Sequence, residues 1–180
     1  SDGTVGLTGD LTRTADWSRS CAGLVPEIKG ATAPQGARHL HLTPRQPFGV
    51  VAKINPFNHP FRCCAEKAAA PLAAGNSVVI KGSEQAPLSS LRLGELCEDI
   101  FPAGVVNVIT GDGKVGSALV RHPDVRRIGF VGSVPTGRLI AQEAAVGLKR
   151  VSLELGGKNP IIIFPDADPK KAAMAAIKGM

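Results

Sequence analysis

The sequence is poor in aromatic residues and has no long hydrophobic run. It contains no tyrosine, one tryptophan and six phenylalanines among 180 residues, so its core must be built mainly from alanine, valine, isoleucine and leucine. Short aliphatic side chains suit a parallel sheet that is covered on both faces. No apolar stretch is long enough to cross a bilayer, and none has the pattern of a signal peptide, so we expect no membrane association.

Zinc-binding cysteine pairs and basic runs are absent as well. Neither the histidines nor the four cysteines (Cys21, Cys63, Cys64 and Cys97) stand at metal-ligand spacing, so we expect no metal site. Reduced thiols predict an intracellular, cytoplasmic protein. The net charge is +6, but the lysines and arginines are dispersed without interleaved aromatic residues. This pattern predicts a solvated basic surface and no nucleic-acid partner.

The first 47 residues differ in pattern from the rest. Residues 10–28 have a loose helical periodicity that Pro26 ends or bends, so residues 1–30 are expected to form an N-terminal helical segment. Residues 31–47 are rich in proline, glycine, histidine and arginine, and the stretch ARHLHLT alternates as a strand does, which predicts an edge β-ribbon. The chain starts without methionine and stops inside a helical pattern, so we interpret both ends as cuts.

Residues 48–180 alternate between strand and helix patterns. We expect strands at 48–54, 77–81, 105–110, 127–132, 150–155 and 160–164, and helices at 60–75, 87–100, 117–122 and 133–145. Asp168 and Pro169 are expected to cap and start a last helix. About five parallel strands joined by helices indicate a doubly wound, Rossmann-like α/β domain. Ligands of such sheets bind beyond the carboxyl ends of the strands, so the residues that follow strands are the informative ones.

Four segments that follow strands carry a recognisable pattern. They are NPFNHP (55–60), KGSEQAP (81–87), FVGSVPTG (130–137) and LELGGKNP (153–160). In this order and spacing they resemble the aldehyde dehydrogenase superfamily, from about residue 47 to the end and weakly before it. The sequence departs from the family at Gly82, where many members have proline, and at Phe57, where tryptophan is common. Neither difference removes a polar contact.

The resemblance implies catalytic roles for Glu154 and Asn58. Glu154 ends a strand beside Gly156 and Gly157, and its family counterpart is the general base that activates water for hydrolysis of a thioester. A lone glutamate without the motif would be interpreted as part of a surface ion pair. Asn58 corresponds to an amide that donates to the carbonyl oxygen as negative charge develops there. Its structural alternative is a turn asparagine that bonds its own backbone.

The resemblance also implies a site for the adenine ribose of a nicotinamide cofactor. Lys81 and Glu84 are expected to hydrogen-bond the ribose hydroxyls, with Ser83 alongside. A carboxylate at this position repels a 2′-phosphate, so the sequence favours NAD, with NADP as the alternative. An exposed ion pair between Lys81 and Glu84 is the structural alternative for these two residues.

The pyrophosphate is expected at the helix that Ser133 caps. Gly132 and Ser133 directly follow a strand, and a helix N-terminus favours a phosphate there, while Gly137 allows close packing of the cofactor. The remaining cofactor contacts that we expect come from Ile54, Phe57 and Leu155. GDGKVG (111–116) has the form of a dinucleotide fingerprint but follows the third strand of the series. Gly111 therefore either lines the adenine pocket or belongs to a plain turn.

Family members of this type use a cysteine nucleophile a few dozen residues after the LELGGK glutamate, beyond Met180. None of the four cysteines fits that role, so we expect the chain alone to be inactive. The function implied is NAD(P)-dependent oxidation of an aldehyde to a carboxylic acid by a longer enzyme. The alternatives are a stand-alone nucleotide-binding or interaction module and a CoA-acylating relative; Glu154 and Asn58 favour catalysis, and Glu154 favours hydrolysis. By resemblance, residues 31–47 join subunits of a homo-oligomer.

Overall fold

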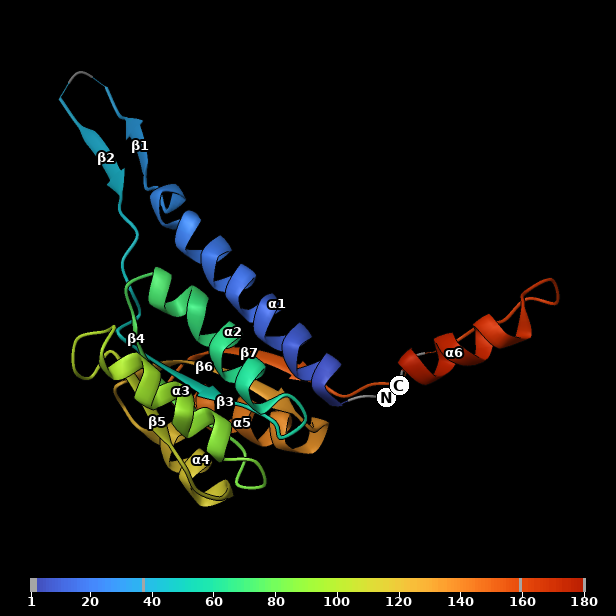
Figure 1. Ribbon diagram of the computed structural model, residues 1–180. Helices are drawn as coiled ribbons and strands as arrows, with labels where there is room; N and C mark the ends of the chain where they lie inside the picture. The colour runs from blue at the N-terminus through green and yellow to red at the C-terminus, as the bar shows by residue number, and fades with distance from the viewer. Residues whose placement is uncertain (1–2, 37, 159, 180) are drawn as a thin grey trace.

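The computed structural model describes residues 3–36, 38–158 and 160–179. The N-terminal segment consists of helix α1 (Gly3–Gly23), a 3-10 turn (Val25–Glu27) and the antiparallel strands β1 (Ala31–Pro34) and β2 (Leu40–Thr43). α1 begins earlier than its periodicity suggests. The two strands form a separate, fully exposed ribbon that projects away from the body of the molecule (Figure 1).

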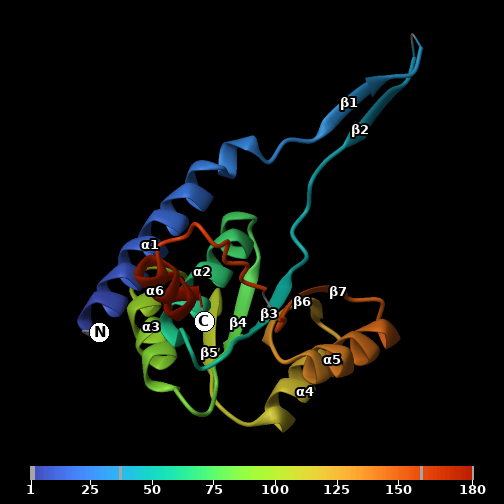
Figure 2. The same ribbon diagram turned by 90° about the vertical axis from the view of Figure 1, so that its right-hand side faces the viewer.

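The main sheet has five parallel strands in the order β5–β4–β3–β6–β7. The strands are β3 (Val50–Ile54), β4 (Ser77–Lys81), β5 (Val106–Ile109), β6 (Val125–Gly132) and β7 (Arg150–Leu155). The helices that connect them are α2 (Pro60–Ala73), α3 (Leu88–Glu98), α4 (Gly113–Arg121) and α5 (Val134–Val146). α2 and α3 cover one face, with α1 packed on α2, and α4 and α5 cover the other (Figure 2). The doubly wound fold expected from the sequence is confirmed.

Each face of the sheet has its own aliphatic core. On the α4–α5 face, Ala52 and Ile128 pack with Ile140 of α5. On the α2–α3 face, Val78 and Ile80 of β4 pack with Cys64 and Ala68 of α2. Few of these buried side chains are aromatic, as the composition requires.

A bulge in β6 sets which side chains face each core. The register of β3 against β6 shifts between Val50 and Val51, so Val125 pairs with Val50 while Arg127 pairs with Val51. Arg126 is the extra residue, and such an insertion reverses the alternation of the residues after it. Val125 and Ile128, three positions apart, therefore both reach the α4–α5 core, and Arg127 turns to the opposite face.

Side-chain caps fix the starts of three helices. Asp112 Oδ1 accepts a hydrogen bond from the Lys114 N–H at 2.9 Å, Ser133 Oγ accepts from Thr136 N–H at 3.4 Å, and Asp168 Oδ1 accepts from Lys170 N–H at 2.8 Å. The last cap confirms the predicted start of α6 (Pro169–Gly179). The prediction of a helix starting at residue 117 was wrong, because the Asp112 cap starts α4 at Gly113.

The strand predicted at residues 160–164 is also wrong. These residues form no strand, and Ile161, Ile162, Ile163 and Phe164 are all exposed. Among the described strands β7 pairs with β6 alone, and the apolar run does not pair with the free edge of β7. α6 follows it and projects away from the sheet (Figure 1). No helix in the described residues combines the length and hydropathy needed to cross a membrane.

Ile128 tests the α4–α5 core. It is fully buried at the centre of that cluster, so Ile128→Ala should lower the free energy of unfolding by about 2–5 kcal/mol, through lost burial and the cavity left behind. Leu139→Ala is the matched control, because Leu139 on α5 is 62% exposed and should change stability by only about 0.5 kcal/mol. Urea unfolding followed by circular dichroism measures both. An equal loss of unfolding free energy in both variants would show that Ile128 is not packed in this core as described.

Candidate active site

The predicted site residues gather along the carboxyl edge of the sheet. β3 pairs with β4 on one side and with β6 on the other, so the chain reverses its direction of winding there. The ends of these strands bring Ile54, Lys81 and Gly132 to one edge, with Leu155 of β7 beyond them. This switch point is where doubly wound sheets bind their ligands.

Lys81 and Glu84 form a contact at the end of β4. The Lys81 side chain is buried, and its Nζ donates to the Gly82 carbonyl at 3.1 Å and lies 3.5 Å from Glu84 Oε2. Glu84 is exposed, and the backbone hydrogen bond at Glu84 itself, with Lys81 beside it, lowers the pKa of this carboxyl. A charged carboxylate therefore faces solvent next to a held ammonium, which is the arrangement needed to accept hydrogen bonds from hydroxyl groups.

The loop after β4 has a local reason for its glycine. A Cβ at Gly82 would lie 2.6 Å from Ser90 Oγ, and Ser90 is fully buried. The departure from the family's proline at Gly82 thus accompanies a buried serine that leaves no room for a side chain. Ser83 Oγ accepts from the Gln85 N–H at 3.2 Å, which stabilises the turn that carries Glu84.

Ser133 and Gly137 shape the start of α5. The Ser133 cap is as expected, and the first intrahelical bond runs from the Gly137 N–H to the Ser133 carbonyl at 3.0 Å. Gly137 is buried, and a Cβ there would meet the Leu155 side chain at 2.6 Å. The space at Gly137 therefore serves the packing of α5 on the end of β7. A contact of Gly137 or Leu155 with a cofactor stays a prediction.

Gly111 adopts a backbone conformation that favours glycine. Its φ is +142°, and a Cβ would collide with the Val115 side chain. The turn interpretation of Gly111 thus has a structural basis, and Asp112 uses this turn to cap α4. Contact with an adenine ring is untested.

Asn58 and Phe57 lie on the loop between β3 and α2. Both are exposed, and Asn58 makes no hydrogen bond with another described residue, so its amide is available to a ligand. The buried Asn55 precedes them: its N–H donates to the Lys81 carbonyl at 3.0 Å, and its Nδ2 lies 3.5 Å from Cys64 Sγ. Asn55 ties the β3 loop to β4, and sequence reasoning did not single it out.

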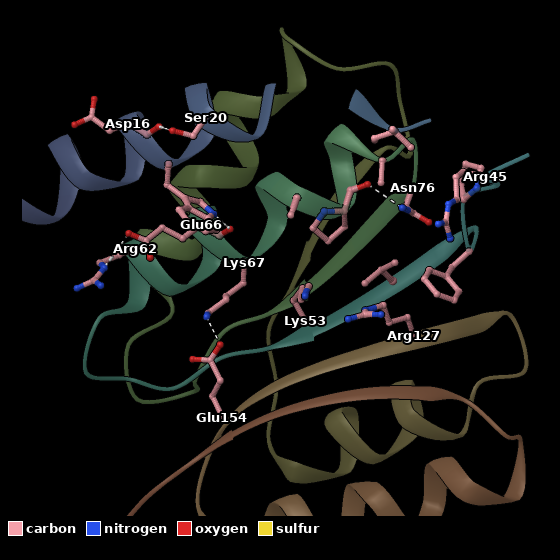
Figure 3. Close-up of a pocket in the computed structure, with 18 of the residues that line it drawn as sticks. Asp16, Ser20, Arg45, Lys53, Arg62, Glu66, Lys67, Asn76, Arg127 and Glu154 are labelled. Carbon is pink, nitrogen blue, oxygen red and sulfur yellow. Dashed lines mark hydrogen bonds and ion pairs between the residues drawn. The ribbon is translucent and has the colours of Figure 1, made fainter. Parts of the chain in front are cut away.

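Glu154 forms an ion pair with Lys67 of α2. Glu154 lies on β7 beside Val131, facing the side of the sheet that α1 and α2 cover (Figure 3). Lys67 was also missed from the sequence. The only signal was its position in the helix that follows Asn58, and the partner it meets is 87 residues away.

Lys53 is the second charged residue that sequence reasoning missed. It lies inside β3, is only 9% exposed, and extends over Gly129 of β6, where a Cβ would come within 2.7 Å of its Nζ. Burial, together with the nearby positive charges of Arg127 and Lys67, lowers the pKa of Lys53 to about 8, against a weaker opposing effect of Glu154. The signal was a lysine inside the apolar strand VVAKI.

A cavity of about 970 Å³ lies between the α1–α2 layer and this face of the sheet. Its lining includes Lys53, Lys67, Arg127 and Glu154 (Figure 3). The predicted cofactor residues lie outside the lining, so Glu154 marks the point where the cavity meets the carboxyl edge. The predicted cofactor residues thus lie at the carboxyl edge of the sheet, the charged cavity lies between the sheet and α1–α2, and Glu154 lies between the two.

The cysteines have no features of an activated nucleophile. Burial raises the pKa of Cys64 to about 11, and it also raises the pKa of Cys63 and of Cys97. Because the thiolate is the reactive form, these three thiols are poorly suited to attack a carbonyl near neutral pH. Cys21 is buried in α1, far along the chain from the site. The described residues also contain no cluster that could hold a metal ion.

A match to a family model decides the relationship: the model described as "Aldehyde dehydrogenase family" matches residues 5–180. The chain belongs to the aldehyde dehydrogenase family. Aldehyde dehydrogenase tropH of Talaromyces stipitatus is 45% identical over 174 residues, which are 95% of this chain and 34% of that protein. The phenylacetaldehyde dehydrogenase of Pseudomonas fluorescens is 45% identical over 171 residues, covering 91% and 34%. The resemblance inferred from the four motifs is confirmed.

A solved aldehyde dehydrogenase has the same fold. The NAD+ complex of the Bacillus cereus enzyme superposes with a TM-score of 0.90 at 40% identity, covering 98% of this chain and 36% of that one. An E. coli structure described as an NADP-dependent enzyme superposes with a TM-score of 0.85 at 40% identity, covering 94% and 36%. The chain therefore spans about a third of the length of its relatives.

The buried Lys53 should make stability depend on pH. Below pH 8 the ammonium is charged in both the folded and unfolded states, so its desolvation destabilises the fold fully; between pH 8 and 10.5 the folded state releases the proton first and the penalty disappears. Lys53→Met should therefore be more stable than the parent by about 2 kcal/mol at pH 7, a figure discounted for partial solvent access.

Urea unfolding of the parent and Lys53→Met between pH 6 and 10.5 measures this difference. It should shrink steadily above pH 8. Lys29→Met, which removes an exposed lysine paired with Glu27, should show no such trend. A constant difference across the whole range would contradict the lowered pKa.

Proposed function

We propose that this chain is the nucleotide-binding part of an NAD(P)-dependent aldehyde dehydrogenase that oxidises an aldehyde to a carboxylic acid. The observation that carries the proposal is the placement of three features at one sheet edge: the Lys81–Glu84 pair, the capped start of α5, and Glu154. A dinucleotide needs the first two, and a hydrolytic step needs the third. The likeness to an NAD+ complex of a family enzyme supports the same assignment.

The residues at the edge fit a dinucleotide. The first intrahelical bond of α5 begins at Gly137, so the N–H groups of Ser133 and Val134 are not used by the helix and can face a phosphate. Lys81 and Glu84, with Ser83 in the same turn, would hold the adenine ribose. Phe57, Ile54, Gly111, Gly132 and Leu155 are proposed to line the remaining path. When bound, the nicotinamide accepts the hydride from the substrate.

Asn58 and Glu154 would act at different stages. The exposed Asn58 amide would donate to the carbonyl oxygen of the aldehyde and stabilise the negative charge that develops when a thiolate adds to it. Glu154 would then take a proton from the water that hydrolyses the thioester. The Glu154 carboxylate is paired with Lys67, so water must compete with this ion pair for the base.

Two alternatives assign the chain a different role. A stand-alone binding module would have no use for Glu154 held next to a cavity, or for an Asn58 amide without a partner. A CoA-acylating enzyme would pass the thioester to CoA and would not need a base for water. The Lys67–Glu154 contact therefore favours hydrolysis over both.

The assembly and location are proposed from separate features. The fully exposed β1–β2 ribbon has free edges that would join subunits in a homo-oligomer, since unpaired strand edges favour pairing with another chain. The four cysteines are unpaired, which supports a reducing, cytoplasmic environment.

Glu84 should set the preference between the two cofactors. Titration calorimetry of the 180-residue chain with NAD and NADP should show tighter binding of NAD, because the Glu84 carboxylate repels a 2′-phosphate. Glu84→Ser should reduce the preference by about tenfold or more, the equivalent of about 1.4 kcal/mol. Glu95→Ser, which removes an exposed carboxylate on α3, is the matched control. Absence of NAD binding would contradict the proposed function, and an unchanged preference would contradict the role of Glu84.

In a full-length enzyme built on this chain, variants of Asn58 and of Glu154 should impair different steps of the reaction. Glu154→Gln should keep a rapid first release of NADH and then nearly stop, because hydrolysis of the thioester needs the base while hydride transfer does not. Asn58→Ala should slow the first release itself, by about 100-fold or more. Stopped-flow absorbance at the NADH band measures both. A normal steady state in Glu154→Gln would reject the base assignment.

A further inference from the structure

The strand register places Lys53 one row below Glu154 on the same face of the sheet. Lys53 lies beside Gly129, and Gly129 lies beside Ser152. Glu154 lies two residues further along β7, beside Val131, and therefore faces the same side. Two residues of a parallel strand span roughly 6.6 Å, which is the separation of the two rows along the strands.

The Lys53 ammonium has no counter-charge of its own. The residue is 91% buried, and its Nζ makes no hydrogen bond or ion pair with any residue that the structure describes. It points into the cavity (Figure 3), and in this position a Cβ at Gly129 would lie 2.7 Å from its Nζ. A buried ammonium without a partner is costly, since its lost hydration is not replaced.

The wall of the cavity has an excess of positive charge. Its cationic residues are Arg13, Arg45, Lys53, Arg62, Lys67 and Arg127, and its acidic residues are Asp16, Glu66 and Glu154. Each acidic residue already has a cation beside it: Asp16 has Arg19, Glu66 has Arg62, and Glu154 has Lys67. Arg127 donates to Ser152 Oγ at 3.0 Å and stacks over Phe48, so it also lacks a carboxylate. Arg45, Lys53 and Arg127 are left without a carboxylate, and of these Lys53 and Arg127 lie on the sheet face below Glu154 and can bind an anion from outside.

We propose that the cavity selects aldehydes that carry a carboxylate, which Lys53 and Arg127 hold while the aldehyde carbon faces Glu154. This inference rests on the proposed function and names the substrate class for the same site. The carboxylate supplies Lys53 with a counter-charge, and hydrogen bonds between charged groups are stronger than those between neutral ones. The Lys53 ammonium reaches over Gly129 of β6, so it is also about one strand spacing, about 4.8 Å, from β7. With hydrogen-bond contacts at both ends, a chain of about five or six carbon atoms suits this combined separation.

Binding of a stable substrate analogue to the 180-residue chain tests the substrate class. The probe is 5-hydroxypentanoate, in which a hydroxyl group replaces the aldehyde, and its uncharged counterpart is 1,5-pentanediol. Titration calorimetry at pH 7 should show at least tenfold tighter binding of the hydroxy acid. In NMR titrations of labelled lysine, the pKa of Lys53 should rise when the hydroxy acid is bound. Equal affinities for acid and diol would overturn the proposal.

Three variants test whether Lys53 is the anion-binding group. Lys53→Met should weaken binding of the hydroxy acid at least tenfold and leave the diol unchanged. Gly129→Ala keeps the charge but displaces the Lys53 ammonium, and it should weaken binding of the hydroxy acid at least threefold. Lys29→Met, which changes an exposed lysine outside the cavity lining that is paired with Glu27, should bind as the parent does. Equal weakening in Lys29→Met would show an effect of net charge alone and reject the site.

Two further measurements separate the possible failures. Acetate that binds as tightly as 5-hydroxypentanoate would show a general anion site and overturn the substrate assignment. NAD titrated into the same samples reports on the proposed function independently. Normal NAD binding without discrimination between acid and diol rejects the acidic substrate alone, whereas absence of NAD binding rejects the proposed function.

Discussion

The pairing of β3 with β6 is the constraint on which the rest of the structure depends. β4 continues the sheet on one side of β3, and β6 starts it on the other, so strands whose paired residues are 75 to 76 positions apart in the chain become neighbours at its centre. Their carboxyl ends open the crevice that a dinucleotide uses in this class of fold. The bulge at Arg126 adds a second consequence, because it turns Arg127 away from the α4–α5 core and toward the cavity. This bulge thus determines both which side chains of β6 enter the α4–α5 core and on which face of the sheet the Arg127 charge lies.

Three glycines allow side chains of neighbouring elements to approach the backbone closely. Gly82 leaves room for the buried Ser90, Gly137 lets α5 approach Leu155, and Gly129 lets the Lys53 side chain lie across β6. None of the three has a positive φ, so the backbone does not require glycine there. Space is the reason in each case. A larger residue at Gly137 would push α5 away from the sheet and move the helix start that Ser133 caps.

The sequence predicts the features that depend on local pattern. The apolar strands, the caps at Ser133 and Asp168, and the four motifs at strand ends were all visible in short stretches, and the fold class and family follow from them. The prediction at 160–164 failed because strand propensity does not tell whether a segment pairs: β7 has a free edge, but residues 160–164 stay unpaired. α4 was placed too late because its first turn lies in a glycine-rich stretch, and the Asp112 cap outweighs the low helix propensity of glycine.

Contacts between distant residues could not be predicted in this way. Lys67 and Glu154 meet because α2 lies over the face on which Glu154 points, and that geometry depends on the order of the strands. Lys53 was visible as a charge inside an apolar strand, which on its own argues for an edge position. The structure instead places it on the central strand, at the cost of an unpaired buried ammonium. Such a charge is retained in a fold only when stability is not the sole constraint on the position, because an uncharged side chain of similar size would fill the same space with less desolvation. The conflict between a charged side chain and a buried position on the central strand therefore supports the inference that Lys53 faces a ligand.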